Sequence, residues 1–295
     1  MTIIWGSNFS VIKTAFRELD PQAFNALRMI VASLAFLAVM GLARWRLTGA
    51  PDSTFYSRAT VTSGEWVQLA VLGFVGHAVY QLCFIGGLAR TSVANSSLML
   101  AVTPVLIAIV SAALGHERIG GRHWLGAAVS TGGIYLVVGR GFALGGRGLV
   151  GDLLMFGAVC CWAIYTLGAR PLMARHSPVA VTGLSMALGT LMYVPLVWPQ
   201  VRDTEWSRVS AWTIGLGVYS ALFALCVAYT IWYIAVRQIG SARTSAYSNL
   251  IPVVAMTSAV IFLGEPLDVR KMLGAVAVLA GVAVTRAAPE MPAEE

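Results

Sequence analysis

The chain has 295 residues, of which 58% are hydrophobic and only 11% are charged, and its formal net charge is +7. Soluble domains carry about 25% charged residues, so this composition excludes a soluble globular protein and indicates an integral membrane protein. The basic residues are scattered one or two to a loop, which favours anionic lipid headgroups over nucleic acid as the partner of the positive charge.

Ten apolar segments follow one another along the chain. A bilayer core about 30 Å thick needs about 20 helical residues, and most of the segments reach that length. We therefore predict an all-α integral membrane protein with ten transmembrane helices. They are expected at residues 2–16, 22–43, 66–88, 93–114, 122–139, 150–170, 178–198, 210–236, 242–263 and 269–286.

Polar side chains stand at membrane depth in the first two segments. Trp5 and Asn8 share one helical face. A buried amide needs a partner, so Asn8 either contacts a ligand or makes a hydrogen bond between helices. Arg28, the deepest charge in the sequence, needs a partner or a wet cavity for the same reason. An ion pair between Arg28 and Glu265 is one hypothesis, because both would lie towards the outer side of the membrane.

The third segment carries an imidazole, a phenol, an amide and an aromatic ring at positions i, i+3, i+4 and i+7, which are His77, Tyr80, Gln81 and Phe84. This spacing places the four side chains on one helical face and predicts the wall of a cavity. The alternative for His77 is an ordinary packing residue. The eighth segment carries a looser aromatic and polar stripe that includes Tyr229.

The fourth and ninth segments each hold polar or flexible side chains just before a proline. Met99 precedes Pro104, and Ser245 and Ser248 precede Pro252. Since proline removes a backbone hydrogen bond, we expect each helix to be interrupted beside these groups. The interruption either frees carbonyls for a ligand or is a kink required for packing.

Small residues form stripes in the fifth and tenth segments, at Gly126, Ser130 and Gly133 and at Gly274, Ala277 and Gly281. Such stripes let helices approach closely, so these segments are predicted to serve in packing or in a homodimer. Glu117 and Glu265 fall at helix-end turns, where a structural ion pair is favoured over proton coupling.

The chain contains an internal repeat. Residues 94–133 and 242–281 share ten identical positions at an offset of 148, and upstream the offset becomes 157, which pairs Trp5 with Trp162. Two homologous halves of five helices, 1–145 and 146–287, are therefore expected, followed by a short polar tail at 288–295. Because five is odd, the halves insert with opposite orientation, which is typical of transporters with a central site and alternating access.

Other classes of protein lack their signatures in this sequence. The cysteines, Cys83, Cys160, Cys161 and Cys226, all fall in apolar segments and are expected to be buried hydrophobes rather than disulfides or metal ligands. No HExxH, GxSxG or phosphate-binding GxxxxGK pattern occurs, so neither an enzyme nor a cofactor nor a metal is expected. A channel is an alternative, but no filter-like loop or charged ring is evident.

Several of these features together resemble the EamA branch of the drug/metabolite transporter (DMT) superfamily, and most closely its amino-acid exporters of the YddG type. They are the Trp5-Gly-Ser-Asn8-Phe opening, Arg28, the Leu-Gly-Glu265-Pro turn followed by Gly274 and Gly281, and the Cys-Trp162-Ala-Ile-Tyr165 segment. The first copy departs from the pattern, with Gly115-His116-Glu117-Arg118 where Gly-Glu-Pro is typical. The resemblance implies a basket of ten helices, a cytoplasmic N-terminus and export of amino acids, including aromatic ones, or related metabolites.

We expect the substrate cavity to be lined from both halves by Trp5, Asn8, His77, Tyr80, Gln81, Met99, Trp162, Tyr165, Tyr229, Ser245 and Ser248. Structural or gating roles are expected for Arg28, Pro104, Glu117, Pro252 and Glu265. These cavity groups suit a neutral or zwitterionic organic solute whose ring stacks on an aromatic side chain. Export of other amphipathic metabolites or drugs is the alternative.

The predictions of proton coupling and of membrane location depend on only a few residues. His77 is the only deep group with a reference pKa near 6.5, so it is the candidate for proton coupling, with facilitated diffusion or exchange as the alternative. Arginine outnumbers lysine eighteen to two, which favours a bacterial inner membrane. Ten loop cations on one side against eight on the other favour cytoplasmic N- and C-termini.

Overall fold

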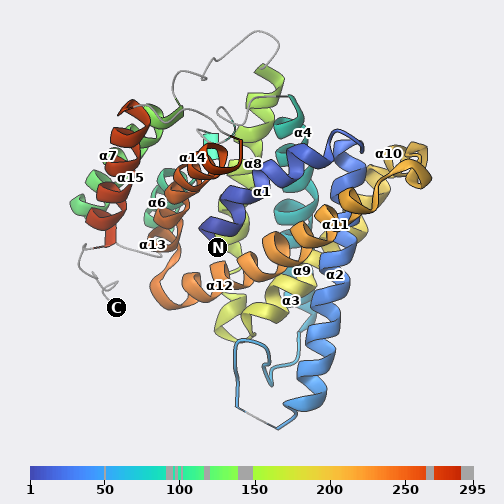
Figure 1. Ribbon diagram of the computed structural model, residues 1–295. Coiled ribbons are helices and arrows are strands. Elements are labelled where there is room, and N and C mark those ends of the chain that lie inside the picture. The colour runs from blue at the N-terminus through green and yellow to red at the C-terminus, as the bar shows by residue number, and fades with distance from the viewer. Residues whose placement is uncertain are drawn as a thin grey trace.

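The computed structural model describes residues 1–49, 51–90, 96, 99–100, 102–115, 120–138, 149–263 and 269–286. Within these ranges the chain is helical and contains no strand (Figure 1). Up to residue 138 the helices are α1 (Thr2–Ala15), α2 (Pro21–Arg46), α3 (Ser63–Gly73), the π-helical turn η1 (Phe74–Val79), α4 (Tyr80–Arg90), α6 (Thr103–Ala113) and α7 (Gly121–Val138).

From residue 149 onward the described chain is again helical. Its helices are α8 (Leu149–Gly168), the 3-10 turn η4 (Leu172–Ala174), α9 (Pro178–Leu196), α10 (Trp198–Asp203), the 3-10 turn η5 (Trp206–Arg208), α11 (Ala211–Tyr219), the π-helical turn η6 (Ser220–Val227), α12 (Ala228–Ile239), α13 (Ser241–Ala246), the 3-10 turn η7 (Tyr247–Asn249), α14 (Leu250–Leu263) and α15 (Val269–Arg286).

Among the described residues, five helical stretches are long and apolar enough to cross a membrane, at Pro21–Arg46, Ser63–Arg90, Leu149–Ala174, Pro178–Leu196 and Ala211–Ile239. Two shorter apolar helices lie at Thr103–Ala113 and Met272–Thr285. Large apolar side chains cover the outside of the bundle, as at Leu191 and Trp45. The all-helical membrane character is therefore confirmed, and the ten crossings stay a prediction.

The second helix of each half begins with the same local signal. Asp20 accepts hydrogen bonds from the backbone N–H groups of Gln22 and Ala23, and Ser177 accepts one from Ala180. A proline follows each of these caps, at a position where a helix needs no backbone donor. Capping thus fixes where α2 and α9 begin.

The two prolines of the fourth and ninth segments stand at helix beginnings rather than inside helices. Pro104 lies in the first turn of α6, and Pro252 lies in the first turn of α14. A missing N–H costs little there, because the first-turn donors have no intrahelical partner. In the ninth segment the expected interruption is the 3-10 turn η7, which joins α13 directly to α14.

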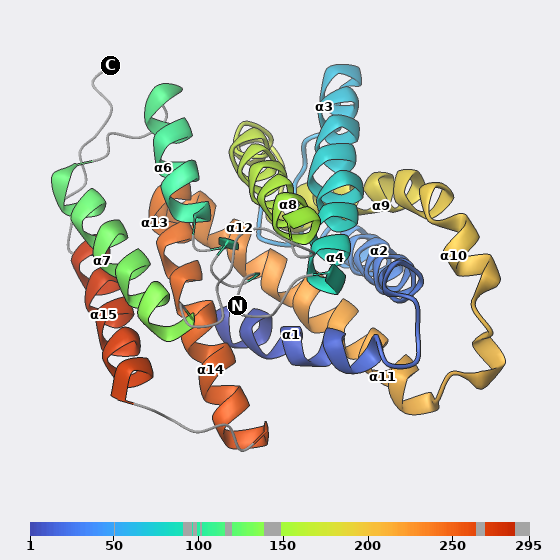
Figure 2. The same cartoon turned by 90° about the horizontal axis from the view of Figure 1, so that it is seen from above.

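Helices α7 and α15 lie side by side at one edge of the bundle (Figures 1 and 2). A Cβ added to Gly126 would lie 2.5 Å from the carbonyl oxygen of Gly281, and one added to Gly133 would lie 2.7 Å from that of Gly274. The predicted packing role of the small-residue stripes is borne out by these contacts. Because the stripes cover each other within one chain, they are not left open for a homodimer.

Residues that the repeat pairs in sequence also touch in space. The hydroxyls of Ser33 and Thr190, which are 157 residues apart, share a hydrogen bond of 2.8 Å between α2 and α9. The Ser130 hydroxyl donates at 3.4 Å to the carbonyl of Val278, 148 residues on. The rings of Trp5 and Trp162, again 157 apart, lie 5.8 Å apart between α1 and α8.

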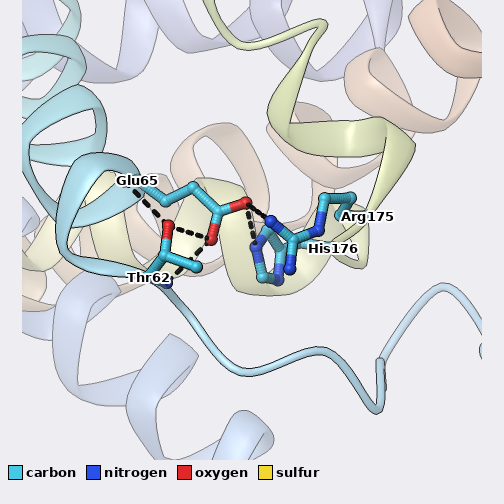
Figure 3. Close-up of polar contacts among 4 residues, drawn as sticks. All are labelled: Thr62, Glu65, Arg175 and His176. Carbon is cyan, nitrogen blue, oxygen red and sulfur yellow. Dashed lines mark hydrogen bonds and ion pairs between the residues drawn. The ribbon is translucent and has the colours of Figure 1, made fainter.

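Polar contacts tie the two halves together at one end of α2 (Figure 3). Thr62 and Glu65 form a capping box at the start of α3. The Glu65 carboxylate also pairs with the Arg175 guanidinium at 2.8 Å and lies 3.2 Å from His176 Nε2, both in the turn between α8 and α9. The starts of α3 and α9 therefore share one end of the molecule.

A second tie lies at the other end of α2, whose 26 residues span about 39 Å. There the Glu18 carboxylate accepts a hydrogen bond of 3.0 Å from the backbone N–H of Ser210, the residue that caps α11. Hydrogen bonds from Ser210 and Thr213 lower the pKa of Glu18 below its ordinary value. The turn between α1 and α2 is thereby fixed to the start of α11.

Candidate functional site

A cavity of about 80 Å³ lies between helices of both halves. This volume holds roughly six water molecules, since each needs about 10–15 Å³. Its wall consists of Trp5, Asn8, Phe9, Ile12, Arg28, Tyr80, Gln81, Phe84, Leu100, Thr103, Trp162, Ala224, Leu225, Tyr229, Trp232, Ser248 and Ile251.

Aromatic rings from three helices form one side of the cavity, which we call the aromatic box: Trp5, Trp162, Tyr229 and Trp232. The Trp162 ring lies 5.0 Å from Tyr229 and 5.3 Å from Trp232, and Trp5 lies within 5.9 Å of the other three rings. Several of these contacts are edge to face, the arrangement that ring quadrupoles favour. Tyr80 extends the box, with its ring 5.3 Å from Trp162. The box offers aromatic faces and edges to a solute.

The first helix is held in place by the π-helical turn η6. Trp5 Nε1 donates to the carbonyl oxygen of Ala224 at 3.0 Å, and the Ser220 hydroxyl donates to Asn8 Oδ1 at 2.6 Å. A π-helical turn disturbs the regular backbone ladder and is frequent at functional sites. Asn8 thus makes a hydrogen bond between helices and also borders the cavity, so the two alternatives for its role are compatible.

His77 lies behind the cavity wall rather than on it. Its Nε2 is 2.9 Å from the Tyr165 hydroxyl and 3.2 Å from the Ser185 hydroxyl, and its ring stacks on Tyr229. Three members of the predicted stripe, Tyr80, Gln81 and Phe84, do border the cavity. His77 departs from them because it falls within η1, where the wider π-helical turn changes the angle between successive side chains.

Of the remaining residues predicted to line the cavity, some border it and others do not. Ser248 borders the cavity from η7, whereas Ser245 is buried and donates to the carbonyl of Ala242 in its own helix. Tyr165 is fully buried beside His77, and Met99 is partly buried; neither is among the residues of the wall. Glu117 and Glu265 lie outside the described residues, so the predicted ion pair with Arg28 remains a prediction.

Arg28 projects from α2 into the wall of the cavity, with its side chain 2% exposed. One guanidinium nitrogen, Nη1, donates to Asn25 Oδ1 at 2.9 Å. The guanidinium carbon lies 5.8 Å from the centroid of the Phe24 ring. Within the described part of the chain, Nε of Arg28 has no hydrogen-bond partner. The sequence placed this residue in a structural role, and the geometry brings it to the cavity.

Trp232 borders the cavity but is not among the residues predicted from the sequence. It lies three positions after Tyr229 and therefore on the same face of α12, a spacing that could have revealed it. Ser220 was also missed, because nothing in the sequence indicates that η6 meets the first helix. The four cysteines are free, and the described residues include no cluster of three or more His, Cys, Asp or Glu side chains that could hold a metal ion.

Comparison with known sequences identifies the family to which this chain belongs. The profile of the EamA-like transporter family matches residues 1–139 and 149–287, and the chain belongs to that family. A relative from Bacillus subtilis, the uncharacterized transporter YyaM, is 25% identical over 288 residues, covering 95% of this chain and 89% of that protein. An uncharacterized transporter from Archaeoglobus fulgidus is also 25% identical, over 97% of this chain and 94% of its own length.

One relative has a more specific name. A protein from Streptantibioticus cattleyicolor, named as a probable terminal-alkyne amino-acid exporter, is 25% identical over 95% of this chain and 89% of its own length. A solved crystal structure shares the fold, with a TM-score of 0.76 at 20% sequence identity, covering 96% of this chain and 93% of that chain. The helices described above are therefore arranged as in a known fold.

Proposed function

We propose that this protein is a secondary transporter that exports amino acids, including aromatic ones, and related small metabolites by alternating access. The observation that carries the proposal is the cavity between the halves, where the aromatic box stands beside Arg28, Asn8 and Gln81. Stacked rings suit a flat organic solute, and the few polar groups orient it. The relative named as an amino-acid exporter supports this substrate class.

The architecture that we propose is ten transmembrane helices in two inverted five-helix repeats, residues 1–145 and 146–287. The family profile matches each half once, which supports the duplication. At an offset of 148, Gly126 corresponds to Gly274, and Gly133 corresponds to Gly281. In space Gly126 meets Gly281 and Gly133 meets Gly274, so equivalent helices run in opposite directions. This crosswise contact supports inversion.

Contacts between equivalent positions support the same arrangement. Where two copies are related by a two-fold axis, residues on the axis meet their own equivalents. The pairs Ser33–Thr190, Ser130–Val278 and Trp5–Trp162 meet in this way. The last pair forms part of the aromatic box, so the proposed substrate site lies at the axis between the halves, where inverted-repeat transporters bind their solutes.

Transport requires the cavity to change. A space for roughly six waters is too small for an amino acid with an aromatic ring, so wall side chains must move to admit one. The proposed motion is a rocking of one half against the other, during which contacts such as Trp5 with Ala224 are made and broken. We place the protein in a bacterial inner membrane with cytoplasmic termini, as the arginine content and loop cations favour.

The test is counterflow of labelled phenylalanine and threonine into proteoliposomes. We expect saturable uptake by the wild-type protein and its loss in Trp162→Ala, which removes a central ring of the aromatic box. Trp212→Ala is the matched control, because Trp212 is 68% exposed and lies outside the cavity wall. Uptake no greater than in empty liposomes, with folded protein, would contradict amino-acid transport.

One observation favours a second substrate class. Part of the wall is purely apolar, formed by Phe9, Ile12, Leu100, Leu225 and Ile251. Such a surface also accommodates amphipathic metabolites or drugs. Competition separates the two: amino acids should reduce phenylalanine counterflow in a saturable way, whereas an exporter of unrelated amphiphiles should be inhibited by these compounds and not by amino acids.

A further inference from the structure

We propose that Arg28 binds the carboxylate of the solute, so that the cavity selects compounds with a free carboxylate, above all α-amino acids. This inference rests on the transport function proposed above and names the chemical group that the same cavity recognises. It assigns to Arg28 a role in specificity, in place of the ion pair expected from the sequence.

The first argument is charge. A guanidinium stays protonated in proteins, and a buried cation is costly unless an anion or several hydrogen bonds compensate it. Arg28 is 2% exposed, yet the described residues of the cavity wall include no aspartate or glutamate. Its neighbours within the described ranges supply one neutral acceptor, Asn25 Oδ1. Among the described residues, the site therefore has one positive charge without a matching negative charge, which a solute carboxylate would provide.

The second argument is hydrogen bonding. Guanidinium has five N–H donors in a planar fork that matches the two oxygens of a carboxylate. Only the bond to Asn25 engages this fork among the described residues, and Nε lacks an acceptor. Trp232, on the wall of the same cavity, has a buried indole N–H that likewise finds no acceptor in the described part of the chain. Arg28 Nε and the Trp232 indole N–H are thus two donors beside one cavity that a solute carboxylate could satisfy.

The third argument is the complementary end of a zwitterion. Gln81 borders the cavity, and its buried Oε1 receives no hydrogen bond from any described residue. An ammonium group supplies donors for it, and the faces of Trp5 and Trp162 attract a cation. The wall thus holds unsatisfied donors and an unsatisfied acceptor, as the two charged groups of an amino acid require. An amine without a carboxylate would instead be repelled by Arg28.

The first part of the test changes the solute and leaves the protein intact. Phenylalanine counterflow by the wild-type protein is measured against three competitors: 3-phenylpropionate, which has only the carboxylate, and phenethylamine and phenylalaninamide, which lack it. We expect both compounds without a carboxylate to compete at least about tenfold more weakly than unlabelled phenylalanine, as the loss of a charge-assisted hydrogen bond implies. Equal competition by phenethylamine would overturn the inference.

The second part changes Arg28. In Arg28→Gln we expect the half-saturation concentration for phenylalanine to rise about tenfold or more, with phenethylamine gaining affinity relative to phenylalanine, and in Arg28→Lys a smaller rise. Arg44→Gln, an exposed site on the same helix, is the matched control and should behave as wild type. An Arg28→Gln protein with unchanged carboxylate preference would overturn the inference.

Two further outcomes are distinguished. If Arg28→Gln does not fold, as judged by its thermal unfolding, the competitor series on the wild-type protein decides alone. If Glu265→Gln and Arg28→Gln alter flux alike while wild type shows no carboxylate preference, Arg28 serves the ion pair and the inference falls. Absence of any saturable amino-acid flux by wild type would instead remove the proposed function, whereas flux without carboxylate preference removes only the inference.

Discussion

His77 illustrates how a single side chain takes its role from its neighbours. The imidazole is fully buried, bonded to the hydroxyls of Tyr165 and Ser185 and stacked on Tyr229. Gly76 makes this packing possible, because a Cβ there would lie 2.3 Å from the Tyr165 ring. Through Tyr229, which is part of the aromatic box, His77 is expected to position the wall without meeting the solute.

We therefore expect His77→Gln to leave the pH dependence of flux unchanged. The variant loses ring packing and a hydrogen bond to Tyr165, so its free energy of unfolding should fall by about 1–3 kcal/mol. Thermal unfolding in detergent and flux between pH 5.5 and pH 8, spanning about one unit or more on each side of the ordinary histidine pKa near 6.5, check the two expectations. Tyr165→Phe, which removes the partner hydroxyl, should lower stability similarly. A displaced pH profile in His77→Gln alone would assign proton coupling to this residue.

At the scale of elements, helices from opposite halves of the sequence lie next to each other in space. Trp5 and Asn8 of α1 bond to η6 in the second half, and Tyr165 of α8 bonds to His77 in η1 of the first. Shifting η1 by 148 residues places it at 222–227, within η6, so both π-helical turns occupy equivalent places in the repeat. Each half therefore supplies the turn on which the other half's first helix is seated.

The contact between α7 and α15 gives a prediction at the same scale. Gly133→Ala would place a methyl group 2.6 Å from the backbone nitrogen of Val278 and 2.7 Å from the carbonyl of Gly274, so the helices must separate. Overpacking of this kind costs about 1–3 kcal/mol of unfolding free energy. At its neighbour Gly132, no heavy atom of the described residues lies within 4 Å of an added Cβ, so Gly132→Ala is the control and should be neutral or slightly stabilising. Equal thermal stability of both variants would contradict this close packing.

At the scale of the whole molecule, the two polar ties mark opposite ends of the bundle. Glu65 with Arg175 joins the first turn of α3 to the turn before α9, and Glu18 with Ser210 joins the turn after α1 to the start of α11. Since α2 runs between these ends over about 39 Å, each end is expected to face a different side of the membrane. The proposed inverted repeat requires this distribution.

Cysteine labelling tests it. In a background whose native cysteines are replaced by alanine, a membrane-impermeant thiol reagent should label Ser53→Cys and Arg175→Cys from one side of the membrane. Arg17→Cys and Arg202→Cys should react only from the other side. All four native residues are exposed at loops or helix ends, so access to the reagent is not limiting. Labelling of residues 53 and 175 from opposite sides would refute the proposed topology.

The sequence by itself determined the class of protein, the helical segments and the residue types of the site. Apolar runs are a local property, and they predicted the helices to within a few residues in most segments. The caps Asp20-Pro21 and Ser177-Pro178, which the structure shows at the starts of α2 and α9, are equally local. Trp5, Tyr80 and Trp162 were found because aromatic and polar groups are conspicuous in an apolar helix. The small-residue stripes predicted packing helices for an equally local reason.

Only the tertiary structure decided which of these side chains meet. A π-helical turn leaves no clear trace in the sequence, so the turn of His77 away from the cavity wall could not be read from its spacing. Pro104 and Pro252 lie in the first turns of α6 and α14, and where those helices begin could not be read from the apolar runs. The approach of Arg28 to the aromatic box joins residues far apart in the chain. Such long-range contacts follow from packing all the helices at once, which no local pattern specifies.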